Sequence, residues 1–224
     1  MTEVREKKLI LGLGHPRTGT GHTSRLLKSW GLRVGHEYMD NHGIVAFQFV
    51  TEALPPMVAI NKYPDIHREM WEFETIIYNL RNPLKSLPSI IFSENYSLEW
   101  RGKWGNFEIK ENILTTGIES LLSWDKMIMS KKPDIIFRIE NQEKFLFEKI
   151  QELYPQLVRW SEVEVGKLHN RRNHEGWENL QKYISDVPRL LLEELNDYSE
   201  RNGYQKIFNT VTYELENSGS LSFS

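Results

Sequence analysis

Apolar residues occur along the chain in short continuous runs that are separated by longer amphipathic stretches. Residues 8–13 (KLILGL) form one such run, and residues 75–80 (TIIYNL) form another that is rich in β-branched and aromatic residues. Runs of this kind are typical of strands covered on both faces, as in a parallel sheet. We predict further strands at 32–34, 57–60 and 134–139.

Helical patterns follow most of these runs. Leucines and a tryptophan share one face of residues 23–30, which Gly31 ends, and Asn82-Pro83 after the second run is a helix-start signal. Strands that alternate with helices predict an α/β fold with a parallel sheet flanked by helices on both faces. Further helices are predicted at 112–129, 142–154 and 188–202, the last with Gly203 as its C′ residue.

Composition narrows the class of protein. The 224 residues are 39% hydrophobic and 26% charged, which excludes a disordered or fibrous chain. With 28 basic and 31 acidic residues the net charge is −3, so a dedicated nucleic-acid partner is not expected. The length predicts one domain over residues 1–213, followed by a Ser-rich, flexible tail at 214–224.

Two further features bear on location and chemistry. The chain has no cysteine, which excludes disulfides, thiolate chemistry and cysteine-based zinc sites. The first apolar run is too short for a signal peptide or a membrane span. We therefore expect a soluble, cytoplasmic protein with no membrane partner, whose oligomeric state the sequence leaves open.

The most informative segment is residues 9–27 (LILGLGHPRTGTGHTSRLL), where a strand leads through a glycine-rich turn directly into a helix. Such a turn points backbone N–H groups and the helix N-terminus at one spot, which suits a phosphate-like anion. The segment lacks the lysine of the Walker A pattern, because Thr20 and Gly21 follow Gly19. It also lacks the third glycine of the dinucleotide-binding pattern. Neither an ATPase nor an NAD enzyme fits well.

Residues 16–20 (PRTGT) instead resemble the 5′-phosphosulfate loop of sulfotransferases, which use 3′-phosphoadenosine 5′-phosphosulfate (PAPS). That loop reads roughly P-[KR]-[ST]-G-T-[ST], so the chain departs from it at Gly21, where a second hydroxyl residue is usual. The resemblance implies a P-loop NTPase-like sulfotransferase architecture. It assigns Arg17 to the leaving charge of sulfuryl transfer and an adenine-stacking position to His22. The implied binding residues of this loop are Pro16, Arg17, Thr18, Gly19, Thr20, Gly21 and His22.

A second segment, residues 75–89 (TIIYNLRNPLKSLPS), resembles another part of the same family: a strand, then R-[DN]-P, then a serine eight residues after the arginine. Arg81 and Ser89 meet that spacing and are implied to hold the 3′-phosphate of PAPS. Pro88 lies between them and is expected to kink the helix. A basic turn at 169–177 resembles the late loop that closes over the 3′-phosphate, which would add Arg171 and Arg172.

Sulfuryl transfer needs a base for the acceptor proton. By its place after the second strand, Glu37 is similar to the base of some sulfotransferase branches, and His36 is the runner-up. A zinc motif H-E-x-x-H would require histidine at position 40, which is Asp40, so no metal is expected. The aromatic residues at 96–107 predict either a substrate-covering loop or a core patch.

The expected reaction transfers a sulfuryl group from PAPS to a hydroxyl or amine of a small-molecule or carbohydrate acceptor and releases adenosine 3′,5′-bisphosphate (PAP). Basic residues are scattered, which does not favour a polyanionic acceptor. Two alternatives remain open. One is a P-loop nucleotide or small-molecule kinase, and the other is a catalytically silent nucleotide-binding module.

Overall fold

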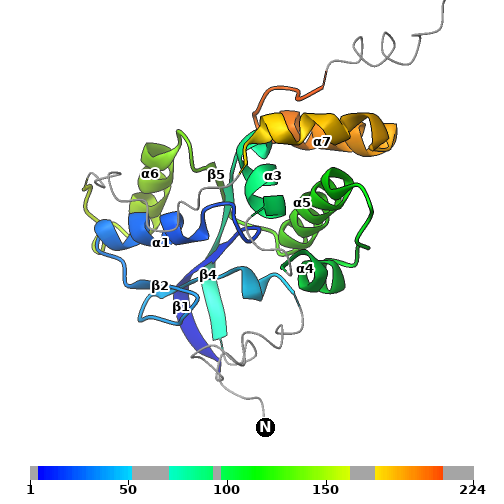
Figure 1. The fold of residues 1–224 in the computed structure, drawn as a ribbon. Helices are drawn as coiled ribbons and strands as arrows, with labels where there is room; N and C mark the ends of the chain where they lie inside the picture. The colour runs from blue at the N-terminus through cyan, green and yellow to red at the C-terminus, as the bar shows by residue number, and fades with distance from the viewer. Residues whose placement is uncertain (1–4, 52–70, 93–96, 162–174, 209–224) are drawn as a thin grey trace, which may run out of the picture.

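The computed structural model describes residues 5–51, 71–92, 97–161 and 175–208. Its centre is a five-stranded, all-parallel sheet in the order β2-β3-β1-β4-β5, so the predicted α/β class is confirmed (Figure 1). The strands are β1 (Glu6–Leu13), β2 (Val34–His36), β3 (Gly43–Val45), β4 (Trp71–Leu80) and β5 (Ile135–Arg138).

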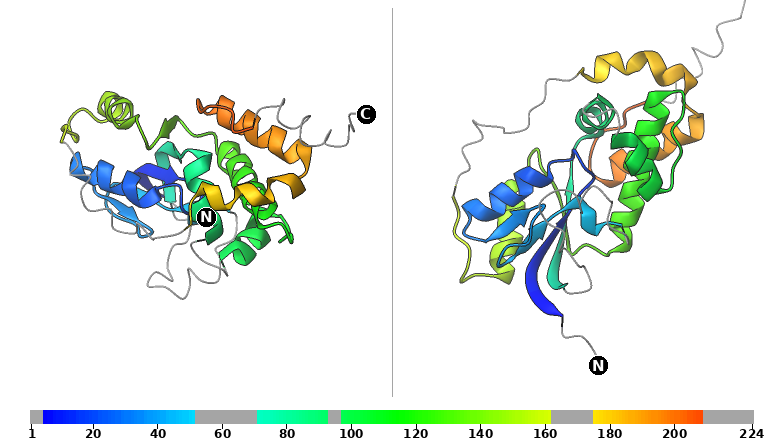
Figure 2. Two further views of the ribbon diagram at one scale, coloured as in Figure 1. Left: turned by 45° about the horizontal axis from the view of Figure 1, so that its top comes forward. Right: turned by 60° about the horizontal axis from the view of Figure 1, so that its bottom comes forward.

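Helices cover both faces of the sheet, because the apolar side chains of its strands alternate between two cores. On β1, Leu11 and Leu13 pack into one core, whereas Ile10 packs into the other. Helices α1 (Thr20–Ser29) and α6 (Glu143–Leu153) complete the core around Ile10. The opposite core is completed by α3 (Pro83–Phe92), α4 (Ser97–Gly105), α5 (Ile113–Ser130) and α7 (Arg189–Arg201), which gather on the other side of the sheet in Figures 1 and 2.

Several predicted bounds shift by one to three residues, and two larger differences have physical causes. Strand β3 has only three residues and gave no recognisable run. The first half of β4 alternates glutamates with aromatic residues, so the apolar run marks only its buried second half. Helix α3 continues through Pro88. The predicted strand at 57–60, the tail at 214–224, Arg171 and Arg172 lie outside the described residues.

Helix ends follow the residues expected at them. Asn112 caps α5 by accepting from the amides of Leu114 and Thr115. Gly203 has a φ of 73° just after α7, the left-handed conformation predicted for a C′ glycine. Within the described ranges, none of the helices combines the length and the apolarity that a membrane span requires.

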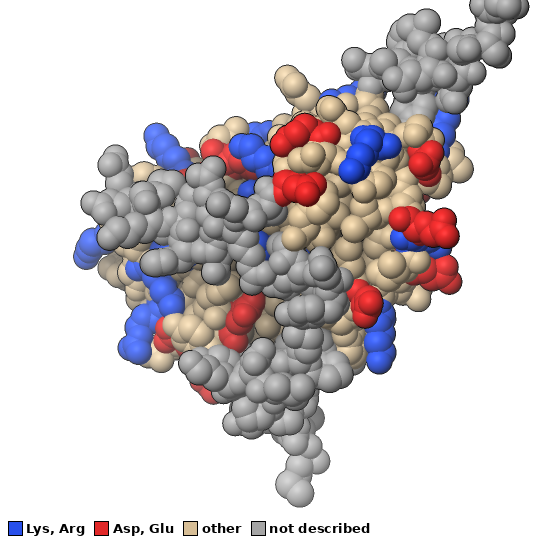
Figure 3. Space-filling view, viewed as in Figure 1, with Lys and Arg blue, Asp and Glu red and all other residues tan. Residues whose placement is uncertain are grey.

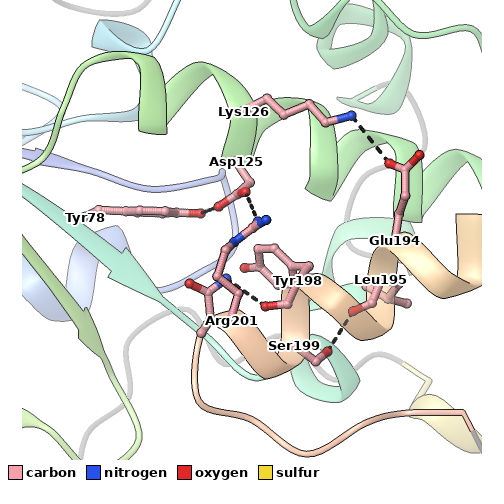
Figure 4. A network of polar contacts seen from close by, with 9 residues as sticks. Tyr78, Asp125, Lys126, Glu194, Leu195, Tyr198, Ser199 and Arg201 are labelled. Atoms are coloured by element: carbon pink, nitrogen blue, oxygen red, sulfur yellow. Dashed lines mark hydrogen bonds and ion pairs between the residues drawn. The ribbon is translucent and has the colours of Figure 1, made fainter.

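A buried polar network ties the last helix to the sheet. The Tyr78 hydroxyl of β4 donates to Asp125 Oδ1 of α5 over 2.9 Å, and Arg201 Nη2 of α7 donates to Asp125 Oδ2 over 2.6 Å (Figure 4). The Asp125 side chain is only 4% exposed. Because one carboxylate accepts from two elements, it fixes α7 against α5 and β4.

We expect Asp125→Ala to lower the free energy of unfolding by about 2 to 4 kcal/mol, because it leaves the buried Tyr78 hydroxyl without its acceptor and frees Arg201. Urea unfolding measures the change. Lys126→Ala is the matched control, since Lys126 pairs with Glu194 on the surface and should cost less than about 0.5 kcal/mol. Equal losses in the two variants would contradict the role given to Asp125.

Candidate functional site

The glycine-rich turn lies at the carboxyl edge of the sheet, between neighbouring strands whose connections leave in opposite directions. After β1 the chain crosses to β2, and after β4 it crosses to β5 at the other edge. Helix α1, which follows β1, covers one face, and α3, which follows β4, covers the other. A crevice outside the strand ends at such a switch point is where open α/β sheets bind ligands.

The turn itself is held in an alternating backbone conformation. Arg17 has a φ of 87° and Gly19 a φ of 100°, so left-handed residues stand on both sides of Thr18. Arginine adopts this conformation only at a cost in energy, which the surrounding contacts must offset. Gly19 is also the N-cap of α1, so the strained turn passes directly into the helix.

Three consecutive carbonyls of the turn accept hydrogen bonds from side chains. The Pro16 carbonyl accepts from His15 Nδ1, the Arg17 carbonyl accepts from Arg81 Nη1 over 3.0 Å, and the Thr18 carbonyl accepts from Asn79 Nδ2 over 3.1 Å. In a trans peptide the carbonyl of one residue and the N–H of the next point in opposite directions. The N–H of Gly19 is therefore turned away from Asn79, whereas the N–H of Thr18 donates to the His15 carbonyl over 3.0 Å and closes the turn.

The amides that follow form a cradle for an anion. Those of Gly19, Thr20 and Gly21 have no hydrogen-bond acceptor among the described residues. Gly19, Gly21 and Arg17 are partly exposed, whereas Thr18 and Thr20 are buried, so the open side of the turn consists of backbone and one guanidinium. Unpaired amides at a helix N-terminus beside a cation favour phosphate.

Arg17, Arg81 and Ser89, which the two sequence motifs supplied separately, come together at this turn. Arg17 Nε donates to Ser89 Oγ over 3.2 Å, and Arg81 holds the Arg17 carbonyl. Arg81 is partly buried, and burial lowers the pKa of its guanidinium while Glu140 and Tyr204 oppose that shift. An arginine remains charged under such conditions. Arg17 thus links the two motifs, since its side chain contacts Ser89 and its backbone contacts Arg81.

Glu140 limits the positive charge on the side next to Arg81. Its carboxylate accepts from the amide of Asn82 over 2.7 Å and from the Tyr204 hydroxyl over 3.0 Å. The carboxylate raises the pKa of the Tyr204 phenol, as does burial, which is the larger cause. These contacts fix the start of α3 against the end of β5, so Arg81 projects from a rigid corner.

His36 and Glu37 lie beside the first turn of α1. His36 Nε2 is 3.3 Å from Thr20 Oγ1 and 3.8 Å from a carboxylate oxygen of Glu37. Burial lowers the pKa of His36, and Arg25 and Lys28 lower it further, so the imidazole is neutral at pH 7. A Cβ on Gly21 would stand 3.3 Å from the ring, so a side chain at that position would require the His36 ring to shift slightly.

Two other predicted residues make contacts within the protein. The Thr18 hydroxyl donates to the His15 carbonyl over 2.8 Å, so its side chain serves the turn. His22 Nε2 lies 3.0 Å from Glu143 Oε1, which joins α1 to α6. The stacking of His22 on adenine and the phosphate contacts of Pro16 and Thr18 stay predictions.

The aromatic segment is helical over residues 97–105, so the alternative of a loop was wrong there. Residues 97–105 form helix α4, and Trp100 packs against Phe47 and Trp124 with ring centroids 5.6 and 6.3 Å away. Polar residues interrupt its apolar positions, which hid the helical period. The alternative of a core patch agrees with this packing.

Sequence reasoning missed His15 and Asn79. Both are at most 1% exposed, and both hold the turn through its carbonyls. The signal available for each was a polar residue inside an otherwise apolar run that borders the glycine-rich turn. A Cβ on Gly14 would lie 2.5 Å from Asn79 Nδ2, so glycine at that position allows the amide its close approach.

Metal ligands do not gather at this site. Among the residues that the structure describes, there is no group of three or more histidine, aspartate or glutamate side chains that could hold a metal ion. Arg17, Arg81 and the backbone amides each contribute positive charge to the crevice.

No family model matches the chain, and no curated protein matches it either. Among solved structures, the mouse sulfotransferase SULT7A1 complexed with PAP is similar over 94% of this chain and 89% of that one, with 12% identity and a TM-score of 0.39. At so low a TM-score the likeness supports neither a fold nor a function, and both depend on the residues of this chain.

We expect His15 to make stability fall in mild acid. Burial, and to a smaller extent Arg101, holds the pKa of His15 well below 6.5. Just below pH 6.5, His15 is therefore protonated in the unfolded chain but neutral in the folded chain. Stability is therefore complete above pH 6.5 and is lost as the pH falls below that value. Each excluded proton contributes a slope of about 1.4 kcal/mol per pH unit.

Urea unfolding of the wild type and His15→Gln at several pH values measures that slope. In the variant, the slope of the free energy of unfolding with pH should be smaller by the contribution of about one proton. The contributions of His36 and His42, whose pKa values are also lowered, should remain. Parallel pH dependences in the two proteins would contradict the assignment of a neutral His15.

Proposed function

We propose that the protein is a PAPS-dependent sulfotransferase that acts on a hydroxyl or amine of a small-molecule or carbohydrate acceptor. The observation that carries the proposal is that Arg17 contacts both Ser89 and Arg81 in the turn whose following amides are unpaired, at the switch point of the sheet. On the face of the molecule that Figure 3 shows, the described basic residues are interspersed with acidic ones and form no patch, which favours a small acceptor over a polyanion.

The residues present fit a nucleotide with phosphates at two positions. The amides of Gly19, Thr20 and Gly21 would hold the 5′-phosphate, as helix N-termini do. Arg81 and Ser89 would hold a 3′-phosphate through charge-assisted hydrogen bonds. PAPS would supply a sulfuryl group on a phosphate leaving group, and Arg17 would offset the charge that develops on the leaving oxygen.

His36 and Glu37 are the candidates for the acceptor proton. The neutral imidazole contacts Thr20 in the first turn of α1, and the Glu37 carboxylate is 3.8 Å from the imidazole, where it can stabilise an imidazolium. We therefore propose that His36 takes the proton and that Glu37 supports the charged ring, which reverses the order that the sequence suggested.

The kinase alternative has weaker support. Thr20 follows Gly19, where a Walker loop carries its lysine. Among the described residues there is also no cluster of metal ligands that would help the phosphates to bind Mg²⁺. A silent nucleotide-binding module would share the cradle and differ only in lacking turnover, so activity separates it from the proposed enzyme.

We expect PAP at a hundred times its dissociation constant to stabilise the protein by about 2.7 kcal/mol, a shift of about 5 to 10 °C in Tm. AMP, which lacks the 3′-phosphate, should give a much smaller shift. Arg81→Ala should abolish the difference between PAP and AMP, because it removes the 3′-phosphate cation. Thermal unfolding measures all three.

Lys85→Ala is the control for that variant, because Lys85 is an exposed cation on α3 and should leave the response to PAP intact. A protein stabilised by ATP with Mg²⁺ but not by PAP would refute the sulfotransferase and restore the kinase.

We expect His36→Gln to lower the rate of sulfuryl transfer from ³⁵S-labelled PAPS by about 10²- to 10⁴-fold, the usual contribution of a positioned base. Because the pKa of His36 is lowered, the wild-type rate should be flat above pH 7 and fall in acid. Glu37→Gln should have a smaller effect.

The matched control is His42→Gln, since His42 accepts from the Arg33 amide at the far end of β3 and should keep full activity. A larger loss in Glu37→Gln than in His36→Gln would make Glu37 the base, and no turnover in any protein would favour the silent module.

A further inference from the structure

Asn79 is a polar residue in the fully buried half of a strand. It lies on β4 between Tyr78 and Leu80, and its side chain is not exposed at all. Its Oδ1 has no hydrogen-bond partner among the described residues, and an unpaired buried acceptor costs stability. An aliphatic side chain would pack in this core without leaving a polar atom unpaired, so we look for the role of the amide outside core packing.

The side-chain hydrogen bonds of Asn79 are both with Thr18 of the phosphate loop, residues 14–21. Nδ2 donates to the Thr18 carbonyl over 3.1 Å and to Thr18 Oγ1 over 3.2 Å. The orientation of the amide follows from chemistry, because the carbonyl can only accept and the Thr18 hydroxyl already donates its proton to His15. The nitrogen must therefore face Thr18.

The consequence falls on the next peptide. Since the Thr18 carbonyl is drawn toward β4, the N–H of Gly19 points the opposite way, into the cradle. Gly19 is left-handed and begins α1, so its amide is the first of the series that faces an anion. Without the Asn79 donor, nothing else among the described residues holds this carbonyl.

We propose that Asn79 is a positioning residue that sets the affinity of the loop for phosphate by fixing the Thr18–Gly19 peptide. The assignment rests on the proposed function only in that the loop binds a phosphate. It does not depend on which nucleotide carries that phosphate.

Isothermal titration of the full chain with PAP, and separately with inorganic pyrophosphate, tests this role. Asn79→Leu has nearly the same volume and no donor, and we expect both dissociation constants to rise about tenfold or more. Thr75→Val is the matched control. Thr75 lies on the same strand as Asn79, and this variant removes its 2.7 Å hydrogen bond to Tyr154 but no contact with the loop. Its dissociation constants should stay within about twofold of the wild type, whatever each variant does to Tm.

Asn79→Asp provides a second reading if the leucine variant does not fold. A protonated carboxyl can donate to the Thr18 carbonyl and a carboxylate cannot, so the affinity of this variant for pyrophosphate should recover toward the wild-type value as the pH is lowered. The wild type should show no such recovery.

The outcomes separate the two proposals. Weaker binding of both probes by Asn79→Leu, with Thr75→Val intact, supports the inference. If the wild type binds pyrophosphate but not PAP, and Asn79→Leu loses that binding, the inference stands while the proposed function fails. Wild-type affinity in Asn79→Leu, or no recovery in Asn79→Asp, overturns the inference alone. A wild type that binds neither probe overturns both.

Discussion

Three hydrogen bonds to consecutive carbonyls, at Pro16, Arg17 and Thr18, determine what the phosphate loop can do. Each carbonyl is bound by a side chain, from His15 in the turn, from Arg81 just after β4 and from Asn79 on β4, and the Gly19 amide is thereby directed to the open side. The arrangement maintains a left-handed arginine that would otherwise relax. A loop built this way is preorganised, so an anion that binds there needs no backbone rearrangement.

The sheet explains how those side chains reach the loop. Because β1 and β4 are neighbours in a parallel sheet, the turn after β1 lies beside the last residues of β4. The same adjacency brings Arg81 and Ser89 to Arg17, although they are 64 and 72 residues away in the chain. The Tyr78–Asp125–Arg201 network fixes the helical layer behind this edge.

Much of this could be predicted from sequence, because the relevant patterns are local. The run before Gly14, the glycine turn and the Asn82-Pro83 helix start each follow from a few neighbouring residues, and together they gave the α/β class and the residues that meet at the crevice. Asn79 could not be assigned, because its contact with Thr18 spans 61 residues, and His15, which bonds the adjacent Pro16 carbonyl, is anchored by Ser120 from 105 residues away. The order of His36 and Glu37 likewise depends on the position of α1 against β2, which no sequence period encodes.

The central claim is that the loop presents amides on its open side to a phosphate, beside two arginines. The crystal structure of the protein with PAP tests this claim most directly. We predict the 5′-phosphate within hydrogen-bond distance of the Gly19, Thr20 and Gly21 amides, the 3′-phosphate on Arg81 and Ser89, and unchanged hydrogen bonds from Asn79 and His15. PAP bound elsewhere, or a loop that must turn its carbonyls over to bind it, would contradict the account.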